Sequence, residues 1–208
     1  GLLVSYRYKK QEFIHNGQGP RPFFWRAPID NDYGARLPVR LKAWKEASYQ
    51  EPKAENFDIV RGKDSTAVKV TYRFPQTDAR WDITYKVYSN GVIKVNNHFV
   101  AENAQAPMIP RVGLRMQLPA RITSLAYYGR GPEENYRDRR TSQFFGEYTS
   151  DIKDMYEPYV RPQENNHRTD IYWCTLTSKA KEGLLFVADR TFEMNVSNYP
   201  LESLDSGD

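Results

Sequence analysis

The sequence predicts an all-β protein built as an antiparallel sandwich. Apolar residues alternate with polar ones along several segments, and an Asn-Gly pair separates two of these segments. Aromatic residues make up 14% of the 208 residues, and 15 residues are tyrosine. Strict alternation gives a strand one dry and one wet face, and aromatic side chains favour such half-buried surfaces. Short spacing between strands, without intervening helices, favours antiparallel connections.

Three segments show the alternation most clearly, namely Val4–Tyr8, Val68–Phe74 and Trp81–Val87. Asn90-Gly91 follows the third segment and favours the positive φ angles of a type I′ hairpin turn. A strand over Ile93–Val95 is therefore expected to pair back on it. Weaker patterns predict six further strands: Val112–Leu118, Leu125–Gly129, Gln143–Tyr148, Tyr172–Thr177, Leu184–Ala188 and Phe192–Ser197.

One segment predicts a short helix, over Leu37–Trp44. Leu37, Leu41 and Trp44 fall at i, i+4 and i+7, so they share one face, while charged residues occupy the other. Pro38 would lie in the first turn, where its missing N–H costs nothing.

We expect residues 1–208 to form a single domain, because no internal repeat or low-complexity linker divides the chain. We also expect this domain to be excised from a longer multidomain chain. The first predicted strand starts close to Gly1, and an antiparallel sandwich needs its edges protected by further elements.

Composition excludes several classes of protein. A single cysteine, Cys174, rules out an internal disulfide framework and a cysteine-based zinc site. The longest apolar runs are far shorter than the about 20 residues of a membrane-spanning helix. The net charge is +4, but basic and acidic residues are interleaved, so neither nucleic acid nor a membrane is expected as a partner. The three histidines are scattered, no metal site is expected, and the compartment, cytoplasm or periplasm, stays open.

Three segments are rich in polar and aromatic residues without periodicity, which is typical of functional loops. They are Phe24–Gly34, Tyr128–Arg139 and Met155–Asp170. The first does not fit a calcium loop that starts at Asp30. Glycine would be needed at position 6 and glutamate at position 12, whereas Gly34 falls at position 5 and Leu41 at position 12. Asp30 or Asp32 is instead expected to cap a turn or to pair with Arg26.

Carboxylates in the other two segments raise the question of acid–base catalysis. Glu133, Glu134 and Asp138 lie among four arginines, which lower carboxyl pKa values and disfavour a general acid. A structural ion-pair network is the preferred interpretation. Glu164 near His167 is a better acid–base pair, but Arg161 and Arg168 flank it, so a salt-bridged loop is the main alternative.

The same segments resemble a known family. The stretches FWRAPIDND (Phe24–Asp32), GRGPEENYRDR (Gly129–Arg139) and YVRPQEN (Tyr159–Asn165) are similar, in the same order, to the C-terminal small-chain domain (domain 5) of LacZ-type β-galactosidases, glycoside hydrolase family 2. FEMNVSNYP (Phe192–Pro200) is similar as well, and the resemblance spans essentially the whole chain.

This resemblance implies an antiparallel β-supersandwich of the galactose-mutarotase-like type. It implies that the catalytic glutamates lie in a separate barrel domain, so no residue of this chain is assigned as catalytic. A loop after the Asp-Asn-Asp motif would help to wall the galactose pocket, with Asp32, Tyr33, Gly34, Ala35 and Arg36 as its residues, in a segment that extends to Arg40. Glu164, Asn165 and His167 are candidates for a polar cluster that faces the sugar.

The parent enzyme would hydrolyse terminal β-galactosides with retention. Its partners would be the other domains of the same chain, the β-galactoside and further copies of the parent. No cofactor is expected in this fragment, whereas Mg and Na would belong to the barrel. A tryptophan of the pocket is expected after Asp208, and a first strand before Gly1. Two alternatives stay open: a stand-alone carbohydrate-binding module, and an aldose mutarotase that would use His167 with Glu164.

Overall fold

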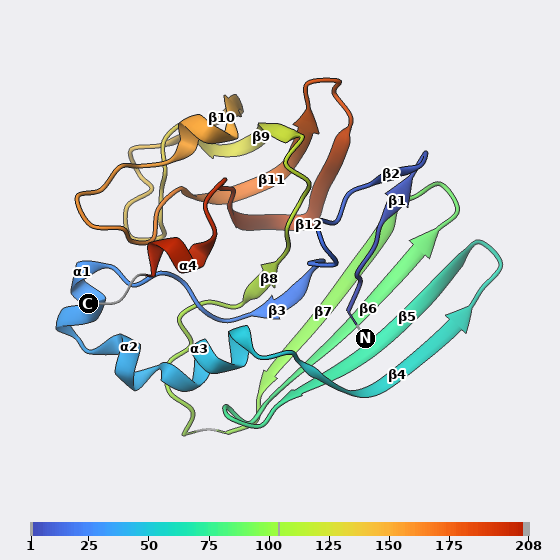
Figure 1. Cartoon of the computed structure of the whole chain (residues 1–208), viewed down its shortest axis with the longest axis horizontal. Coiled ribbons are helices and arrows are strands. Elements are labelled where there is room, and N and C mark those ends of the chain that lie inside the picture. The colour runs from blue at the N-terminus through green and yellow to red at the C-terminus, as the bar shows by residue number, and fades with distance from the viewer. Residues whose placement is uncertain (1, 104, 206–208) are drawn as a thin grey trace. The chain divides into compact units, whose positions relative to one another are not determined.

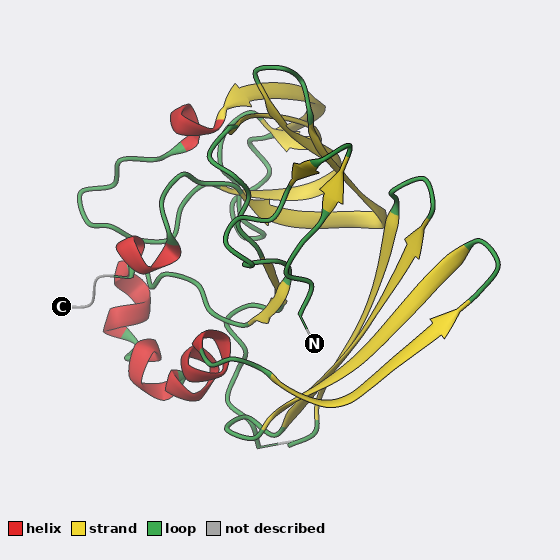
Figure 2. Ribbon diagram, turned by 45° about the vertical axis from the view of Figure 1, so that its right-hand side comes forward, coloured by secondary structure: helices red, strands yellow, loops and turns green. Residues whose placement is uncertain are grey.

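The computed structural model describes residues 2–103 and 105–205. Strands account for 46% of the chain and helices for 12%, and every strand pair is antiparallel. The prediction of an all-β antiparallel fold is therefore confirmed (Figure 2). Within the described residues, no helix is long and apolar enough to cross a membrane.

Contacts divide the chain into two compact units, each described by itself below. The first unit comprises Gly1–Trp25 and Gly34–Gln117, and the second comprises Arg26–Tyr33 and Leu118–Asp208. Whether both belong to the single domain expected from the sequence stays a prediction.

The first unit is built on a four-stranded sheet in the order β4-β5-β6-β7 (Figure 1). Its strands are β4 (Lys53–Arg61), β5 (Ser65–Phe74), β6 (Ala79–Tyr88) and β7 (Ile93–Ala101). The predicted alternation holds in β5 and β6, since Val70 pairs with Ile83 and Tyr72 with Trp81 on one buried face. Two small pairs complete the unit: β1 (Arg7–Tyr8) with β2 (Gln11–Glu12), and β3 (Arg21–Phe23) with β8 (Gly113–Arg115).

Helices α2 (Leu37–Arg40) and α3 (Lys42–Tyr49) replace the single predicted helix over Leu37–Trp44. The helix is interrupted at Leu41, which has a non-helical ψ of 16°, and it continues to Tyr49. Leu41 and Trp44 are buried as the periodicity predicts. Trp44 packs against Phe24 and donates its indole N–H to the carbonyl of Pro107 at 3.0 Å.

Three expectations for this unit are wrong in detail. The strand predicted over Val4–Tyr8 forms only at Arg7–Tyr8, because the carboxylate of Glu12 accepts the backbone N–H of Tyr6 at 2.8 Å. The Asn90-Gly91 turn is not type I′, since only Gly91 of the pair has a positive φ, 90°. The strand predicted over Val112–Leu118 is limited to β8, because the backbone of Gln117 bonds to His15 and Gln18 instead.

The second unit is built on a four-stranded sheet in the order β10-β9-β11-β12. Its strands are β9 (Ile122–Gly131), β10 (Phe144–Asp151), β11 (His167–Ser178) and β12 (Gly183–Asn195). One face of this sheet forms a core that includes Leu125, Tyr127, Ile171, Cys174 and Leu176. Short helical segments lie at α1 (Asp30–Gly34), η1 (Ile152–Met155) and α4 (Leu201–Leu204).

The two strands predicted over Leu184–Ala188 and Phe192–Ser197 are one strand, β12. Val187 pairs with Trp173 and Phe192 pairs with Ile171, so the residues between them bulge out of the ladder. This bulge interrupts the alternation and makes one strand resemble two in the sequence.

Candidate functional site

Polar side chains gather in the second unit where the loop after β9 meets the start of β11 and the end of β12. The loop follows Gly131, whose peptide bond to Pro132 is cis. It carries Glu134, Asn135 and Tyr136 beside the backbone of β11, since the N–H of Asn135 donates to the carbonyl of His167 at 2.8 Å. These residues belong to two of the three segments that the sequence singled out.

Asn135 is fully buried and joins the loop to β11. Its amide nitrogen donates to the carbonyls of Arg130 and Glu133, each at 3.1 Å. Its carbonyl oxygen accepts both the backbone N–H and the hydroxyl of Thr169. All four bonding directions of the amide group are thereby used.

Glu134 is the buried acid of the loop. Its carboxylate forms an ion pair with Arg139, accepts the hydroxyl of Tyr159 and accepts the backbone N–H of Asn166 at 2.6 Å. The ion-pair interpretation is therefore confirmed for Glu134, whereas Glu133 and Asp138 form no ion pair among the described residues. These three contacts hold the Glu134 side chain between the loop, Tyr159 and the segment before β11.

The predicted cluster of Glu164, Asn165 and His167 does come together, and all three residues are buried. Asn195 at the end of β12 connects them. Its amide nitrogen donates to the Glu164 carboxylate at 2.9 Å and to the Asn165 carbonyl at 2.8 Å. Its oxygen lies 2.8 Å from Nδ1 of His167.

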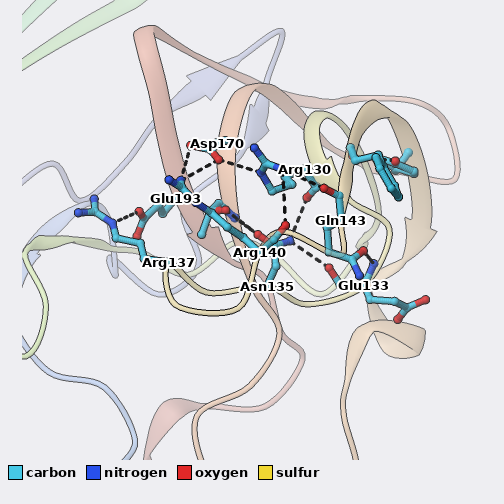
Figure 3. Close-up of polar contacts among 11 residues, drawn as sticks. Arg130, Glu133, Asn135, Arg137, Arg140, Gln143, Asp170 and Glu193 are labelled. Atoms are coloured by element: carbon cyan, nitrogen blue, oxygen red, sulfur yellow. Dashed lines mark hydrogen bonds and ion pairs between the residues drawn. The ribbon is translucent and has the colours of Figure 1, made fainter.

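His167 is held on both sides of its ring. Nε2 lies 3.1 Å from a carboxylate oxygen of Glu193, and the ring stacks on Tyr136 with centroids 5.1 Å apart. Both ring nitrogens thus face side-chain oxygens. Glu193 also pairs with Arg137 at 2.6 Å (Figure 3). The hydrogen bond from His167 and then that from Arg137 lower the pKa of Glu193 to about 2.

The arginines that flank Glu164 and His167 contact further groups of the second unit. Arg168 donates to the carbonyls of Pro132 and His167, at 3.1 and 3.2 Å. Arg161 lies 3.7 Å from Asp30 and stacks on the ring of Tyr33, 4.1 Å from its centroid.

Asp170 forms a second ionic centre on β11. It accepts Nε of Arg130 at 3.0 Å and Nη1 of Arg140 at 2.9 Å, and Arg130 also donates to the carbonyl of Gln143 at 2.9 Å (Figure 3). The arginines thus bind the loop after β9 to β11 and hold it in place.

Tyr136, the tyrosine of the GRGPEENYRDR stretch (Gly129–Arg139), has unused hydrogen-bonding capacity. The hydroxyl of Tyr136 is buried without a hydrogen-bond partner in the described part of the chain. Burial raises the pKa of this phenol, and the nearby Glu164 and Glu134 carboxylates raise it further. Tyr136 therefore stays protonated and offers a donor next to His167.

The predicted substrate-pocket loop divides into an anchored and an exposed part. Asp32 is buried, pairs with Arg26 at 2.6 Å and accepts the N–H of Ile29 at 3.0 Å, so the prediction that it caps a turn and pairs with Arg26 is confirmed. Gly34, Ala35 and Arg36 are exposed, and Arg36 has a left-handed φ of 56°. Their contribution to a pocket stays a prediction.

Sequence reasoning missed Asn135, Tyr136, Asp170, Glu193 and Asn195 as members of this network. Asn135 and Tyr136 lay within a quoted stretch, but nothing local distinguished them. Asn195 and Glu193 are far from His167 in sequence and reach it only through strand pairing. Among the described residues, no group of three or more acidic, histidine or cysteine side chains is placed to hold a metal ion.

Comparisons with known proteins point to one family. The family model described as β-galactosidase small chain matches residues 1–208. A β-galactosidase of Priestia megaterium is 33% identical over 208 residues, which cover 100% of this chain and 20% of that protein. β-Galactosidases of Streptococcus thermophilus and Lactobacillus delbrueckii subsp. bulgaricus are 32% and 33% identical over 98% and 96% of the chain, and 20% and 19% of their own lengths are covered. The chain spans about a fifth of these curated relatives.

Proposed function

The chain belongs to the β-galactosidase small-chain family, and we propose that it is a non-catalytic domain of a longer, retaining β-galactosidase of glycoside hydrolase family 2. Its role would be to help wall the galactose pocket of a barrel domain that lies elsewhere in the parent chain. Mg and Na would bind in that barrel, and the substrate would be a terminal β-galactoside.

The observation that carries this proposal is that carboxylates of the polar network are already bound by arginine or histidine side chains. A retaining glycosidase needs two carboxyl groups about 5–5.5 Å apart, one of them protonated and both open to the sugar. Here Glu134, Asp170 and Glu193 each face arginine or histidine donors. With a pKa of about 2, Glu193 is ionised at neutral pH. These acids fit a scaffold that fixes loops better than they fit proton transfer.

The segment Asp32–Arg36 is suited to support a pocket wall. Its first residue is fixed by Arg26 and Ile29, whereas Ala35 and Arg36 are exposed. A rigid base with an exposed tip is the arrangement that positions a substrate without contributing to the chemistry.

The polar cluster argues against a mutarotase. Glu164 and His167 would have to face one sugar ring, yet both bond to Asn195, and His167 also stacks on Tyr136. No observation favours a stand-alone carbohydrate-binding module over the proposed role.

A bulky substitution at the exposed tip tests the pocket wall in the parent enzyme. Ala35→Trp should raise KM for a nitrophenyl β-galactoside at least tenfold, since the indole would occupy space used by the sugar. Lys42→Trp, at an exposed position of α3, is the matched control and should leave KM unchanged. Equal KM values in both variants, with both folded, would overturn the wall role.

A second measurement tests the non-catalytic role. Residues 1–208 alone should not hydrolyse the same substrate. Turnover that survives repurification and disappears in Glu164→Gln would assign the chemistry to this chain.

A further inference from the structure

The sheet of the second unit differs from that of the first in how it distributes apolar residues. In β5 and β6 the apolar positions face one side, and the other side carries residues such as Lys69 and Thr84. In β12 the run Leu184–Ala188 is apolar throughout. A continuous apolar run is typical of a strand that is covered on both faces.

The register shows where the second set of apolar residues lies. Leu184 and Phe186 pair with Leu176 and Cys174, which are core residues. The alternate positions Leu185 and Val187 must therefore lie on the opposite, outer face, because neighbouring residues of a strand point to opposite sides.

Aromatic residues continue this outer face across the sheet. Val187 pairs with Trp173 on β11, and Trp173 pairs with Tyr128 on β9. The ring of Tyr128 lies 5.4 Å from that of Tyr172 and 6.5 Å from that of Phe145 on β10. A register shift between Ile171 and Trp173 lets Tyr172 share this face. The outer-face patch consists of Tyr128, Phe145, Tyr172, Trp173, Leu185 and Val187.

The outer-face patch is open to solvent among the described residues, 2–103 and 105–205. Val187 is 67% exposed, Leu185 63%, and Phe145 and Tyr172 45% each. A contiguous apolar patch of this kind marks an interaction surface more often than a solvated one. Charged groups lie around it: Arg130 stacks on Phe145, and Glu147 pairs in register with Tyr128.

We propose that the outer-face patch is the surface on which a segment of the parent chain outside residues 1–208 packs. This inference rests on the proposed function, because it requires a longer parent. The curated relatives are about five times as long as the matched region. A parent of similar length would therefore contain further chain that can cover the patch. The rings of the patch can stack on a sugar, but Leu185 and Val187 offer neither a ring nor a hydrogen bond, so a sugar would leave part of the patch uncovered.

Cysteine accessibility in the full-length parent tests the inference. Val187→Cys and Leu185→Cys are mild changes, and each is labelled with a maleimide in the native and in the urea-unfolded protein. We expect native labelling at both positions to be at least tenfold slower than unfolded labelling. Lys69→Cys, exposed on β5, is the control and should react at similar rates in both states. Peptide mass spectrometry assigns the labelled site, and no enzymatic activity enters the readout.

Four outcomes decide the question. Slow native labelling that is independent of protein concentration and of galactose supports the inference. Native labelling as fast as that of the Lys69 variant overturns it. Protection that disappears on dilution assigns the patch to a second copy, and protection that needs galactose assigns it to a sugar; both overturn the inference. Hydroxyl-radical oxidation of Tyr128 and Tyr172 in the unsubstituted parent gives the same decision without any variant. A parent that lacks β-galactosidase activity would refute the proposed function and leave this measurement valid.

Discussion

The side-chain oxygen of Asn135 accepts two hydrogen bonds from Thr169, one from its backbone N–H at 3.0 Å and one from its hydroxyl at 2.6 Å. Both residues are 0% exposed, and they join the loop after β9 to β11. Because water cannot replace a partner at this depth, the pair controls whether the loop stays docked.

Asn135→Ala should therefore lower the free energy of unfolding by about 3 kcal/mol, since it leaves several buried groups without partners. Thr169→Val removes only the hydroxyl and should cost about 1 kcal/mol. Urea unfolding followed by tryptophan fluorescence measures both. Asn96→Ala, at an exposed position of β7, is the matched control and should change stability by less than about 0.5 kcal/mol. A similar small change for Asn135→Ala would contradict the role assigned to this residue.

Glu193 should make stability depend on pH in the acid range. Its pKa is about 2 in the folded chain against an ordinary 4.5, because of the hydrogen bonds from His167 and Arg137. The folded state thus favours the ionised form of Glu193. Its contribution to the free energy of unfolding is present above about pH 4.5 and is lost as the pH falls towards 2. Glu193→Gln should cost about 1 kcal/mol at pH 7, since the site is partly exposed.

The difference between the Glu193→Gln variant and the unsubstituted chain should then shrink between pH 4.5 and the acid limit of folding. Urea unfolding at pH 7, 4.5 and 3 tests this. Glu147→Gln on β10 is the control and should change stability by less than about 0.5 kcal/mol at each pH. If the loss of stability caused by Glu193→Gln grows on acidification, the predicted direction of the pH dependence is wrong.

Gly183 at the start of β12 cannot accept a side chain. A Cβ there would lie 1.9 Å from the carbonyl oxygen of Leu176 and 2.8 Å from Cα of Thr177, so the paired backbones would have to separate. Gly183→Ala should destabilise the chain by about 2 kcal/mol or more. At Gly113 a Cβ meets nothing within 4 Å, so Gly113→Ala should be neutral. Equal thermal midpoints for the two variants would contradict this account of the hairpin.

Cys174 should be unreactive in the folded chain. Burial raises the pKa of its thiol to about 12, so almost no thiolate exists at pH 8. A thiol reagent such as dithionitrobenzoate should react with it only after unfolding in urea. Rapid reaction of the native chain would mean that this part of the core opens readily.

Much of the fold could be predicted because the side-chain pattern along a strand is local. Alternation identified β5 and β6 and the face they bury, and helical spacing identified Leu41 and Trp44 as core residues. β4 was missed because all nine of its residues are exposed at a sheet edge. A strand without a buried face needs no alternation of apolar and polar residues. β12 was divided in two because its bulge breaks the alternation.

The candidate site was predicted less completely. Glu164, Asn165 and His167 lie close together in the chain and do meet at Asn195, but that they face a sugar stays a prediction. Asn195, which connects them, and Glu193, which lies against the other side of the His167 ring, are 28 and 26 residues from His167. The pairing of β11 with β12 brings them together, and no local pattern encodes that register.

The sequence by itself determined that β5 and β6 are half-buried, that Asp30 or Asp32 would cap a turn or pair with Arg26, and that Glu134 would pair with a neighbouring arginine. Each of these follows from residues near one another in the chain. Only the tertiary structure decided the partners of His167, the apolar outer face of the β9–β12 sheet and the full burial of Asn135. Those depend on long-range strand register, which sets the depth of each side chain and the groups it meets, and hence the energy of every polar contact in the site.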